Sequence, residues 1–456
     1  MTSTSPRTIF IVLEDGTAIR NILRTDVFTV LKARKDLRIV IFTPLADDEF
    51  RREMAAENVV VAMKPKYKIG VIAGIFESFK KEIWAEKTGI YTFAQKRIRK
   101  PAHRFRLFVL KHILRANTSE RLQQLLDLFE QWKLKVTPLL ASEYFDRFNP
   151  DLVFYAVYNK SHYIERGAQQ RAIRTVAFVL SWDNPTSKGP FLVTPDRVIV
   201  WNDLLKQELI QYHNYNPDSL YVSGVPQFDL YTHRDKFLSR EAFFKKCRLD
   251  PSKKLITYTT GTPGTAPFDH EVVELLYDSM QKGELRQPSQ LLVRLHPKDR
   301  IEDYRRFENK SDLIIQLPGR RASTGNSWNP THEDMYGLAE LMLYTDVNVN
   351  VASTITIDAA CFDTPIVNVA YDGFTTKPYA DSCLRYLDYE HYKVVVKTAG
   401  VKIAYSNEET IRHIQSYLDD RTQEAAGRKL IREQQCWKLD GQSSRRIAEY
   451  ILGQLP

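Results

Sequence analysis

Residues 344–372 read YTDVNVNVASTITIDAACFDTPIVNVAYD, and this stretch predicts a strand, a tight turn, a short helix and a second strand. Three valines over 347–351 alternate with small polar residues, which is typical of a strand buried in a sheet. The helix is predicted over 357–362, and the next strand begins at Ile366. This order indicates one parallel strand–helix–strand unit of an α/β sheet.

Small hydroxyl residues stand where this helix is predicted to begin. Ser353 and Thr354 follow the first strand, and Asp358 lies about one turn further on. A Ser or Thr at such a place can cap the helix, and the backbone N–H groups there can bind a phosphate or diphosphate. Ligands of open α/β sheets bind outside the carboxyl ends of the strands. Two interpretations stay open, phosphate binding and simple capping.

The composition indicates a globular chain with an anionic partner. The net charge is +9, the pI is about 9.1 and the length is 456 residues, enough for two or three domains. Nucleotides, phospholipid head groups and nucleic acid are all anionic partners of suitable charge. The four cysteines lack CxxC spacing, which argues against a zinc site and a disulfide framework and fits a reducing compartment.

The N-terminal residues MTSTSPRTIF contain no basic segment followed by an apolar one, so we expect no signal peptide. No apolar run approaches the roughly 20 residues that a membrane-spanning helix needs. The sequence therefore predicts a cytoplasmic protein, either soluble or peripheral on the inner face of the membrane.

The first half of the chain opens with a predicted strand over 8–13, a helix, and a second strand over 37–43, which indicates a parallel sheet. Glu14 and Asp15 follow the first strand, where active-site groups collect, and Arg20 lies one turn further on. Glu14 or Asp15 is a candidate catalytic base, and Arg20 is a candidate acceptor-binding residue. Alternatively, the two acids only favour the helix dipole.

A basic segment lies within residues 80–115. Between 96 and 115 there are eight Lys and Arg residues and no acids, interleaved with apolar and aromatic residues. Such a segment can contact an anionic membrane or hold an anionic acceptor. Alternatively, it is a solvated helix face that packs on the domain. We expect no nucleic-acid binding, because no recognition motif accompanies the charge.

Residues 181–189 read SWDNPTSKG and follow a predicted strand over 175–180. The segment is dense in turn-forming residues, so it is predicted to be a loop at the carboxyl edge of the sheet. Asp183 is a candidate catalytic base, and Asn184 and Lys188 are candidate acceptor-binding residues. Alternatively, the segment is only a polar loop.

The second half contributes the candidate nucleotide site. A predicted strand over 254–260 ends in a hydroxyl-rich loop whose backbone N–H groups can meet a phosphate. A second strand ends in an Arg and a His, which can bind phosphate, and a later loop carries a Trp that can stack on a base. The candidates are Thr260, Gly261, Arg294, His296 and Trp328.

The same patterns divide the chain into domains. The turn at 223–229 indicates a boundary, giving an acceptor domain over 1–228 and a donor domain over 229–425. The β-branched run at 392–397 predicts a strand. The charged segment 426–456 predicts one C-terminal helix, long enough to pack back on the N-terminal domain.

Four motifs together resemble known families. They are SWDNPTSKG at 181–189, SGVPQFD at 223–229, RLHPKD at 294–299 and TDVNVNVASTITIDAACFDTPIVNV at 345–369. They are similar to motifs of bacterial surface-polysaccharide glycosyltransferases, of the CDP-glycerol glycerophosphotransferases of teichoic acid synthesis and, more distantly, of non-hydrolysing UDP-GlcNAc 2-epimerases. The resemblance implies a GT-B fold, with two Rossmann-like α/β domains facing a cleft and a C-terminal helix crossing back.

The resemblance also implies roles for the second-half residues. The nucleotide diphosphate would bind the second domain, with His296 near the diphosphate or the leaving group. Ser353 and Thr354 would hold phosphate oxygens, and Asp358 would lie near the ribose or the donor sugar. GT-B enzymes need no bound metal ion, because helix dipoles and basic side chains stabilise the leaving diphosphate.

The resulting hypothesis is a metal-independent glycosyltransferase. It would move a sugar from a nucleotide-sugar to a surface-glycan or lipid-linked acceptor in the first domain, with Glu14, Asp15 or Asp183 as the base if it inverts. The glycerophosphotransferases usually carry Asp-Tyr-Ser-Ser where this chain has Val-Ala-Ser-Thr at 351–354, which favours a sugar donor. The alternatives are a CDP-glycerol-type glycerophosphotransferase, a non-catalytic nucleotide-sugar-binding protein and a basic membrane-surface adaptor.

Overall fold

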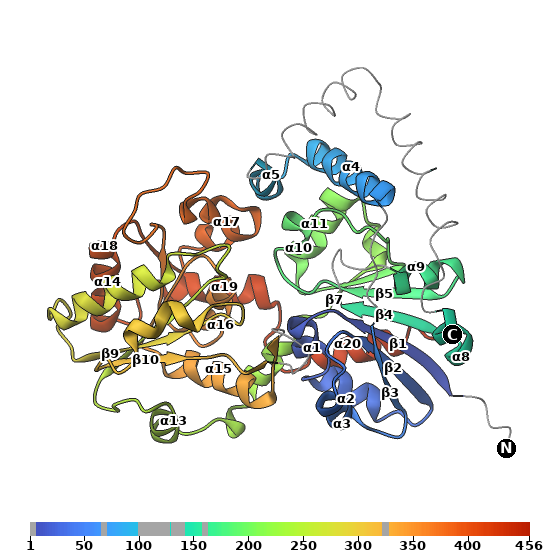
Figure 1. Ribbon diagram of the computed structural model, residues 1–456, viewed down its shortest axis with the longest axis horizontal. Coiled ribbons are helices and arrows are strands. Elements are labelled where there is room, and N and C mark those ends of the chain that lie inside the picture. The colour runs from blue at the N-terminus through green and yellow to red at the C-terminus, as the bar shows by residue number, and fades with distance from the viewer. Residues whose placement is uncertain (1–5, 65–70, 99–127, 129–141, 157–162, 322–327) are drawn as a thin grey trace. The chain divides into compact units, whose positions relative to one another are not determined.

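The computed structural model describes residues 6–64, 71–98, 128, 142–156, 163–321 and 328–456. The chain forms two compact units (Figure 1). Unit 1 runs from the N-terminus through Ser223 and includes Ser444–Pro456, whereas unit 2 comprises Gly224–Arg321 and Trp328–Ser443. Of the predicted basic segment, residues 99–115 lie outside the described residues.

Unit 1 is built on a seven-stranded sheet in the order β3-β2-β1-β4-β5-β6-β7. All of its strand pairs are parallel. The strands are β1 Arg7–Leu13, β2 Leu37–Thr43, β3 Val59–Met63, β4 Leu152–Ala156, β5 Arg174–Phe178, β6 Arg197–Val200 and β7 Leu220–Val222. Every residue from Ile9 to Leu13 is fully buried. Because successive strand residues point to opposite faces, both faces of the sheet are covered.

The helices of unit 1 connect these strands in chain order. They are α1 Gly16–Ile22, α2 Asp26–Lys32, α3 Asp48–Met54, α4 Val71–Thr88, α5 Tyr91–Ile98, α8 Ser142–Phe148, α9 Tyr163–Gln170, α10 Asn184–Ser187, α11 Asp203–His213 and α20 Ser443–Leu452. The predicted opening of strand, helix and strand is confirmed, although two helices, α1 and α2, stand between β1 and β2.

The single C-terminal helix predicted over 426–456 is wrong, because the structure has two helices there. The first is α19 Ala425–Cys436 in unit 2, and the second is α20. Trp437 has a φ of 62°, a left-handed backbone that ends the first helix, and Gly441 has a φ of 71° in the following turn. Because an α-helix needs a negative φ at each residue, Trp437 and Gly441 prevent one continuous helix.

Unit 2 is built on a six-stranded parallel sheet in the order β10-β9-β8-β13-β14-β15. The strands are β8 Lys254–Thr259, β9 Ser289–Arg294, β10 Leu313–Gln316, β13 Val347–Asn350, β14 Ile366–Val369 and β15 Lys402–Ala404. A separate antiparallel pair is formed by β11 Arg320–Arg321 and β12 Trp328–Asn329. Together with unit 1, these sheets confirm the predicted pair of parallel α/β domains.

The helices of unit 2 are α12 Pro226–Asp229, α13 Arg240–Cys247, α14 Asp269–Gln281, α15 His332–Tyr344, α16 Ile355–Cys361, α17 Glu390–Lys397, α18 Asn407–Asp419 and α19. The strand predicted at 392–397 is therefore wrong, since these residues belong to α17. Tyr392 and Val395 are three residues apart and both buried, which is the spacing of one helix face. Across the described ranges of both units, every helix is too short or too polar to cross a bilayer.

Candidate functional site

The carboxyl edge of the unit 2 sheet brings together residues from three adjacent strands. Thr259 of β8 pairs with Arg294 of β9 on one side and with Asn350 of β13 on the other. The residues that follow these strands, His296 among them, therefore leave the sheet side by side. This edge is where ligands of parallel α/β sheets bind.

His296 is held in a defined orientation at this edge. Its backbone N–H donates to Thr260 Oγ1 over 2.8 Å, and its ring Nδ1 accepts from the Lys298 N–H over 3.0 Å. An accepting Nδ1 means that, in the neutral ring, the proton sits on Nε2. His296 is thus set up as a hydrogen-bond donor through Nε2, the role expected for a residue that meets a diphosphate.

Thr260 and Gly261, both predicted to bind phosphate, are engaged by the protein itself. The Thr260 hydroxyl donates to the buried carboxylate of Asp299 over 2.7 Å. The Gly261 N–H donates to Asp269 over 2.6 Å, and the Tyr258 hydroxyl donates to the same carboxylate over 2.6 Å. Burial raises the pKa of Asp269 to about 7. In this structure these two residues build the loop rather than offer donors to a ligand.

Ser353 and Thr354 lie between β13 and α16. Thr354 is the exposed N-cap residue of α16, but its side chain makes no capping hydrogen bond. The Ser353 backbone carbonyl accepts from the Thr356 N–H over 3.1 Å. The capping interpretation is therefore wrong for Thr354, and its hydroxyl stays a candidate ligand for phosphate.

The side chains of Asp358 and Arg294 are both hydrogen-bonded to other side chains of the protein. Asp358 is buried in α16 and accepts a hydrogen bond from the Tyr231 hydroxyl. The Arg294 guanidinium donates to Gln316 Oε1 on β10 over 2.7 Å, and burial lowers its pKa. Each side chain already has a protein partner. Trp328, predicted to lie in a loop, instead belongs to β12.

A buried polar network supports the start of α16. Asn350 donates to Asn348 over 2.8 Å and accepts from Thr356 and Asn368, each over 3.2 Å. The Tyr392 hydroxyl donates to Asn368 over 2.7 Å and lies 2.9 Å from the Thr356 hydroxyl. All five residues are fully buried. The polar residues that alternate with the valines therefore fix the helix that follows the strand.

In unit 1, Glu14 and Asp15 follow β1 at the carboxyl edge but make different interactions. Asp15 accepts hydrogen bonds from the N–H groups of Thr17 and Ala18, over 3.1 and 3.2 Å, and so caps α1. The Glu14 carboxylate forms an ion pair with Lys64, which follows β3. The side chain of Glu14 is 15% exposed and that of Lys64 is 2% exposed. Glu14 as a functional residue therefore stays a prediction, whereas Asp15 serves as a helix cap.

Asp183 follows β5 at the same edge and is held by two serines. Its Oδ1 accepts from the Ser181 hydroxyl over 2.7 Å, and its Oδ2 accepts from the Ser187 hydroxyl. The side chain is half-buried. A carboxylate oriented in this way can accept a proton from a hydroxyl group that approaches it.

The predicted acceptor-binding residues are spread over this edge. Asn184 is buried, and its Oδ1 accepts from the Ser181 N–H over 3.2 Å, so it shapes the turn. Lys188 is exposed directly after α10, and Arg20 is half-buried in the last turn of α1. Only Lys188 presents an exposed side chain.

Two charged residues of unit 1 were not among the predicted site residues, Lys64 and Glu165. Lys64 directly follows β3, a strand rich in β-branched residues. Glu14 was selected because it directly follows a predicted strand, and the same rule would have selected Lys64. Glu165 lies in α9 and is fully buried, and burial raises its pKa to about 7. No pattern in the sequence marks Glu165, since an acid near the start of a helix is ordinarily solvated.

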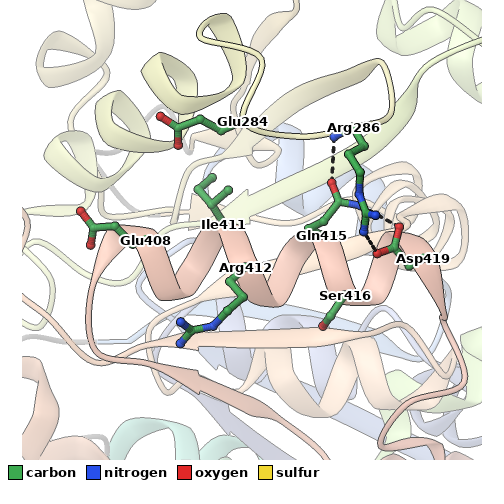
Figure 2. A pocket seen from close by; sticks show the side chains of 8 residues that line it. All are labelled: Glu284, Arg286, Glu408, Ile411, Arg412, Gln415, Ser416 and Asp419. Atoms are coloured by element: carbon green, nitrogen blue, oxygen red, sulfur yellow. Dashed lines mark hydrogen bonds and ion pairs between the residues drawn. The ribbon is translucent and has the colours of Figure 1, made fainter.

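A groove of about 430 Å³ lies elsewhere in unit 2, and none of the predicted site residues lines it. Figure 2 shows the Arg286 side chain paired with Asp419 and the Arg286 backbone N–H donating to Gln415, both of α18. Arg286 precedes β9, so its side of the groove is at the amino end of the sheet. The groove is separate from the candidate site at the carboxyl edge.

Comparisons with known proteins agree with this architecture. The family model described as CDP-glycerol:poly(glycerophosphate) glycerophosphotransferase matches residues 192–453, more than half of the chain. No curated protein matches the sequence significantly.

Three solved structures illustrate the fold. The chain is similar to a UDP-GlcNAc 2-epimerase from Neisseria meningitidis bound to UDP-GlcNAc, with 12% identity, a TM-score of 0.54 and coverage of 98% of this chain and 100% of that one. It is similar to WaaG, a glycosyltransferase involved in lipopolysaccharide biosynthesis, with 11% identity, a TM-score of 0.50 and coverage of 98% and 100%. It is also similar to the wall teichoic acid polymerase TagF, with 10% identity, a TM-score of 0.51 and coverage of 99% and 89%.

These identities establish the fold alone, whereas the family match covers part of unit 1 and all of unit 2. The chain therefore belongs to the CDP-glycerol:poly(glycerophosphate) glycerophosphotransferase family and is a transferase of the GT-B fold.

Proposed function

We propose that this transferase moves a sugar from a nucleotide-sugar to a hydroxyl group of a glycan or lipid-linked acceptor, without a bound metal ion. The observation that supports this most is the meeting of His296, Ser353 and Thr354 at one carboxyl edge of unit 2. A donating imidazole and two hydroxyl residues beside a helix start suit the oxygens of a diphosphate.

In the proposed reaction the acceptor oxygen attacks the anomeric carbon, and the bond from that carbon to the diphosphate oxygen breaks. The nucleoside diphosphate leaves with the bonding electrons, and His296 stabilises its negative charge by a hydrogen bond from Nε2. The acceptor proton passes to a carboxylate of unit 1, either Asp183 or Glu14. Asp15 is no longer a good candidate base, because its carboxylate caps α1.

A second candidate is transfer of glycerol phosphate from CDP-glycerol, and the family match favours it. In that reaction the acceptor oxygen attacks the β-phosphorus and CMP leaves. The identity of the released nucleotide separates the two candidates, because sugar transfer releases a nucleoside diphosphate.

The first experiment is a thermal-shift panel with CMP, CDP, UDP, GDP and dTDP, each with magnesium and with EDTA. A nucleotide at about 100 times its dissociation constant adds about 2.7 kcal/mol of stability. We expect one diphosphate to stand out equally in both buffers. A response that needs magnesium would overturn the metal-independent proposal, and no response to any nucleotide would contradict the proposed donor site.

The His296→Ala variant tests the site itself. We expect loss of most of the shift with the preferred nucleotide and a fall in turnover of about 100-fold or more, the usual cost of removing a donor to developing charge. His296→Gln, which keeps an N–H donor, should recover part of both. The control is His413→Ala in α18, a half-buried histidine whose ring contacts the Ile403 carbonyl. Full binding and turnover by His296→Ala would refute the assignment.

The acceptor side is proposed from charge. The net charge of +9 supports an anionic, lipid-linked acceptor and peripheral contact with an anionic membrane on the cytoplasmic side. Co-sedimentation with vesicles containing anionic phospholipid should fall as salt rises. Equal binding to neutral vesicles, or none to either, would contradict this part of the proposal.

A further inference from the structure

Two buried cysteines of unit 2 lie with their sulfur atoms in contact. The Sγ of Cys361, the last residue of α16, is 3.5 Å from the Sγ of Cys436, the last residue of α19. The two residues are 75 positions apart in the chain, so only the fold brings them together. They are 7% and 1% exposed. A free buried cysteine ordinarily acts as a small hydrophobic side chain, but two facing thiols can also be oxidised to a disulfide.

The other two cysteines have partners of a different kind. Cys383 is buried as well, but its thiol donates to the Tyr371 carbonyl over 3.2 Å. Cys247 is half-buried, and its sulfur accepts from Gln316 Nε2 over 3.8 Å. Of the four cysteines, all of which lie in the described ranges, only the pair at 361 and 436 makes a sulfur–sulfur contact.

The packing of α19 on α16 holds the two thiols together. Arg432 Nη1 of α19 donates to the Ala360 carbonyl at the end of α16 over 2.8 Å. One turn earlier in α19, the fully buried Arg428 side chain pairs through Nε with Asp363 over 2.9 Å. A disulfide has an S–S bond of about 2.05 Å, so the sulfurs must approach by about 1.5 Å. We expect side-chain torsions to supply a movement of this size while the helices stay in place.

We propose that Cys361 and Cys436 form a redox modification site, at which a hydroperoxide converts the two thiols into a disulfide that crosslinks α16 to α19. First, the Cys361 thiolate attacks a peroxide oxygen and the O–O bond breaks. The hydroxide that leaves takes up the thiol proton, which gives water and a sulfenic acid. Next, the Cys436 sulfur attacks the sulfenic sulfur, the S–O bond breaks and a second water leaves. Two electrons and two protons thus pass from the thiols to the peroxide.

The structure also indicates that this reaction is slow. Burial raises the pKa of the Cys361 thiol, and the residue lies at the C-terminal end of α16, where the helix dipole disfavours a negative charge. Because the thiolate is the nucleophile, the pair should respond to sustained oxidation rather than to a brief pulse. The crosslink does not depend on the proposed sugar transfer.

Mass spectrometry of the full chain after prolonged treatment with hydrogen peroxide tests the crosslink directly. Free thiols are blocked first, and the chain is then cut with chymotrypsin. Cleavage after Phe362 and Tyr371 separates Cys361 from Cys383, which trypsin would leave on one peptide. We expect one pair of peptides joined through Cys361 and Cys436, lighter by two hydrogen atoms than the separate peptides, and released by dithiothreitol.

Variants identify the cysteines involved. Cys436→Ala should abolish the joined pair, and Cys361→Ala replaces this variant if it fails to fold. The matched control is Cys383→Ala, the loss of an equally buried thiol, which should leave the crosslink intact. Conversion of Cys361 to a sulfinic acid without a crosslink, or pairing of either cysteine with Cys247, would overturn the proposal.

Calorimetry measures the effect of the crosslink on folding. A disulfide between residues 75 positions apart restricts the unfolded chain of unit 2. We expect peroxide to raise the transition of unit 2 by about 5 °C or more, with no rise in Cys436→Ala and reversal by dithiothreitol. The transition of unit 1, which contains none of the four cysteines, should stay in place. A lower transition of unit 2 in the crosslinked chain would show that the native packing does not accept the disulfide, and would overturn the proposal.

Discussion

At the scale of the residue, Asn350 shows that the polar positions of the valine-rich strand β13 form a buried hydrogen-bond network. Its amide group donates to Asn348 and accepts from Thr356 and Asn368, all within the protein interior. A buried network of this kind fixes one arrangement of its members when each is satisfied, and it is costly when one is lost. The start of α16 is held to the sheet in this way.

We therefore expect Asn350→Ala to destabilise unit 2 by about 3 kcal/mol or more, because three buried groups lose a partner at about 1–3 kcal/mol each. Denaturant unfolding followed by a probe in unit 2 measures this. Thr354→Ala is the matched control, since its side chain makes no capping bond, and it should change stability by less than about 0.5 kcal/mol. A large loss in the control would revive the capping interpretation.

At the scale of the element, α4, α10 and α11 are tied together by one histidine and one tryptophan. The Trp84 indole N–H of α4 donates to the Tyr212 carbonyl over 2.6 Å, and its ring centroid lies 5.1 Å from that of His213. The Nε2 of His213 contacts the Pro185 carbonyl of α10 over 2.9 Å. Burial lowers the pKa of His213 to about 4.

This contact predicts a dependence of stability on pH. The unfolded chain takes up a proton at His213 near pH 6.5, but the folded chain only near pH 4, so stability falls as the pH drops through this window. We expect the loss to be about 2 kcal/mol, less than the full shift because His213 as a residue is only half-buried. His213→Gln should flatten this part of the curve, measured by urea unfolding between pH 7 and 4. An unchanged slope would contradict the assignment.

The helix α17 shows where local sequence preference misleads. A run of three valines favours a strand and predicts one over 392–397. The structure forms a helix instead, which puts Tyr392 and Val395 on one buried face and lets the Tyr392 hydroxyl reach Asn368 and Thr356. Tertiary packing outweighs the propensity difference, which is small for each residue.

At the scale of the whole molecule, the end of the chain completes unit 1. Ile447, Ala448 and Ile451 of α20 are fully buried. Tyr450 stacks on Tyr221 with ring centroids 4.2 Å apart, and Arg446 Nε donates to the Ser223 carbonyl over 2.9 Å. The last residues of the sequence thus belong to the core of the first unit.

Deleting residues 444–456 should therefore destabilise unit 1 by on the order of 5 kcal/mol, mainly through the lost burial of two isoleucines. Calorimetry should show the transition of unit 1 moving down while that of unit 2 stays close to its original temperature. Tyr450→Ala is a milder test and should shift only the first transition. A selective loss in unit 2 would contradict the division into units.

Much of the site could be predicted from which residues directly follow the predicted strands. Residues that follow buried parallel strands meet at one edge, so Glu14, Asp183 and His296 were correctly expected at the carboxyl ends of their strands. What each side chain does there was not predictable. Asp15 caps a helix and Gly261 binds an internal carboxylate, because residues only two to eight positions further along the chain take up their hydrogen bonds.

The sequence by itself determined the alternation of strands and helices, the two parallel sheets and the strand–turn–helix–strand unit at 344–372, since hydrophobic period and turn residues are local signals. Only the tertiary structure decided that the C-terminal segment is two helices, that 390–397 is helical and that Glu165 is buried. These features depend on contacts between residues far apart in the chain, where the energy of burial and of paired charges exceeds any local preference.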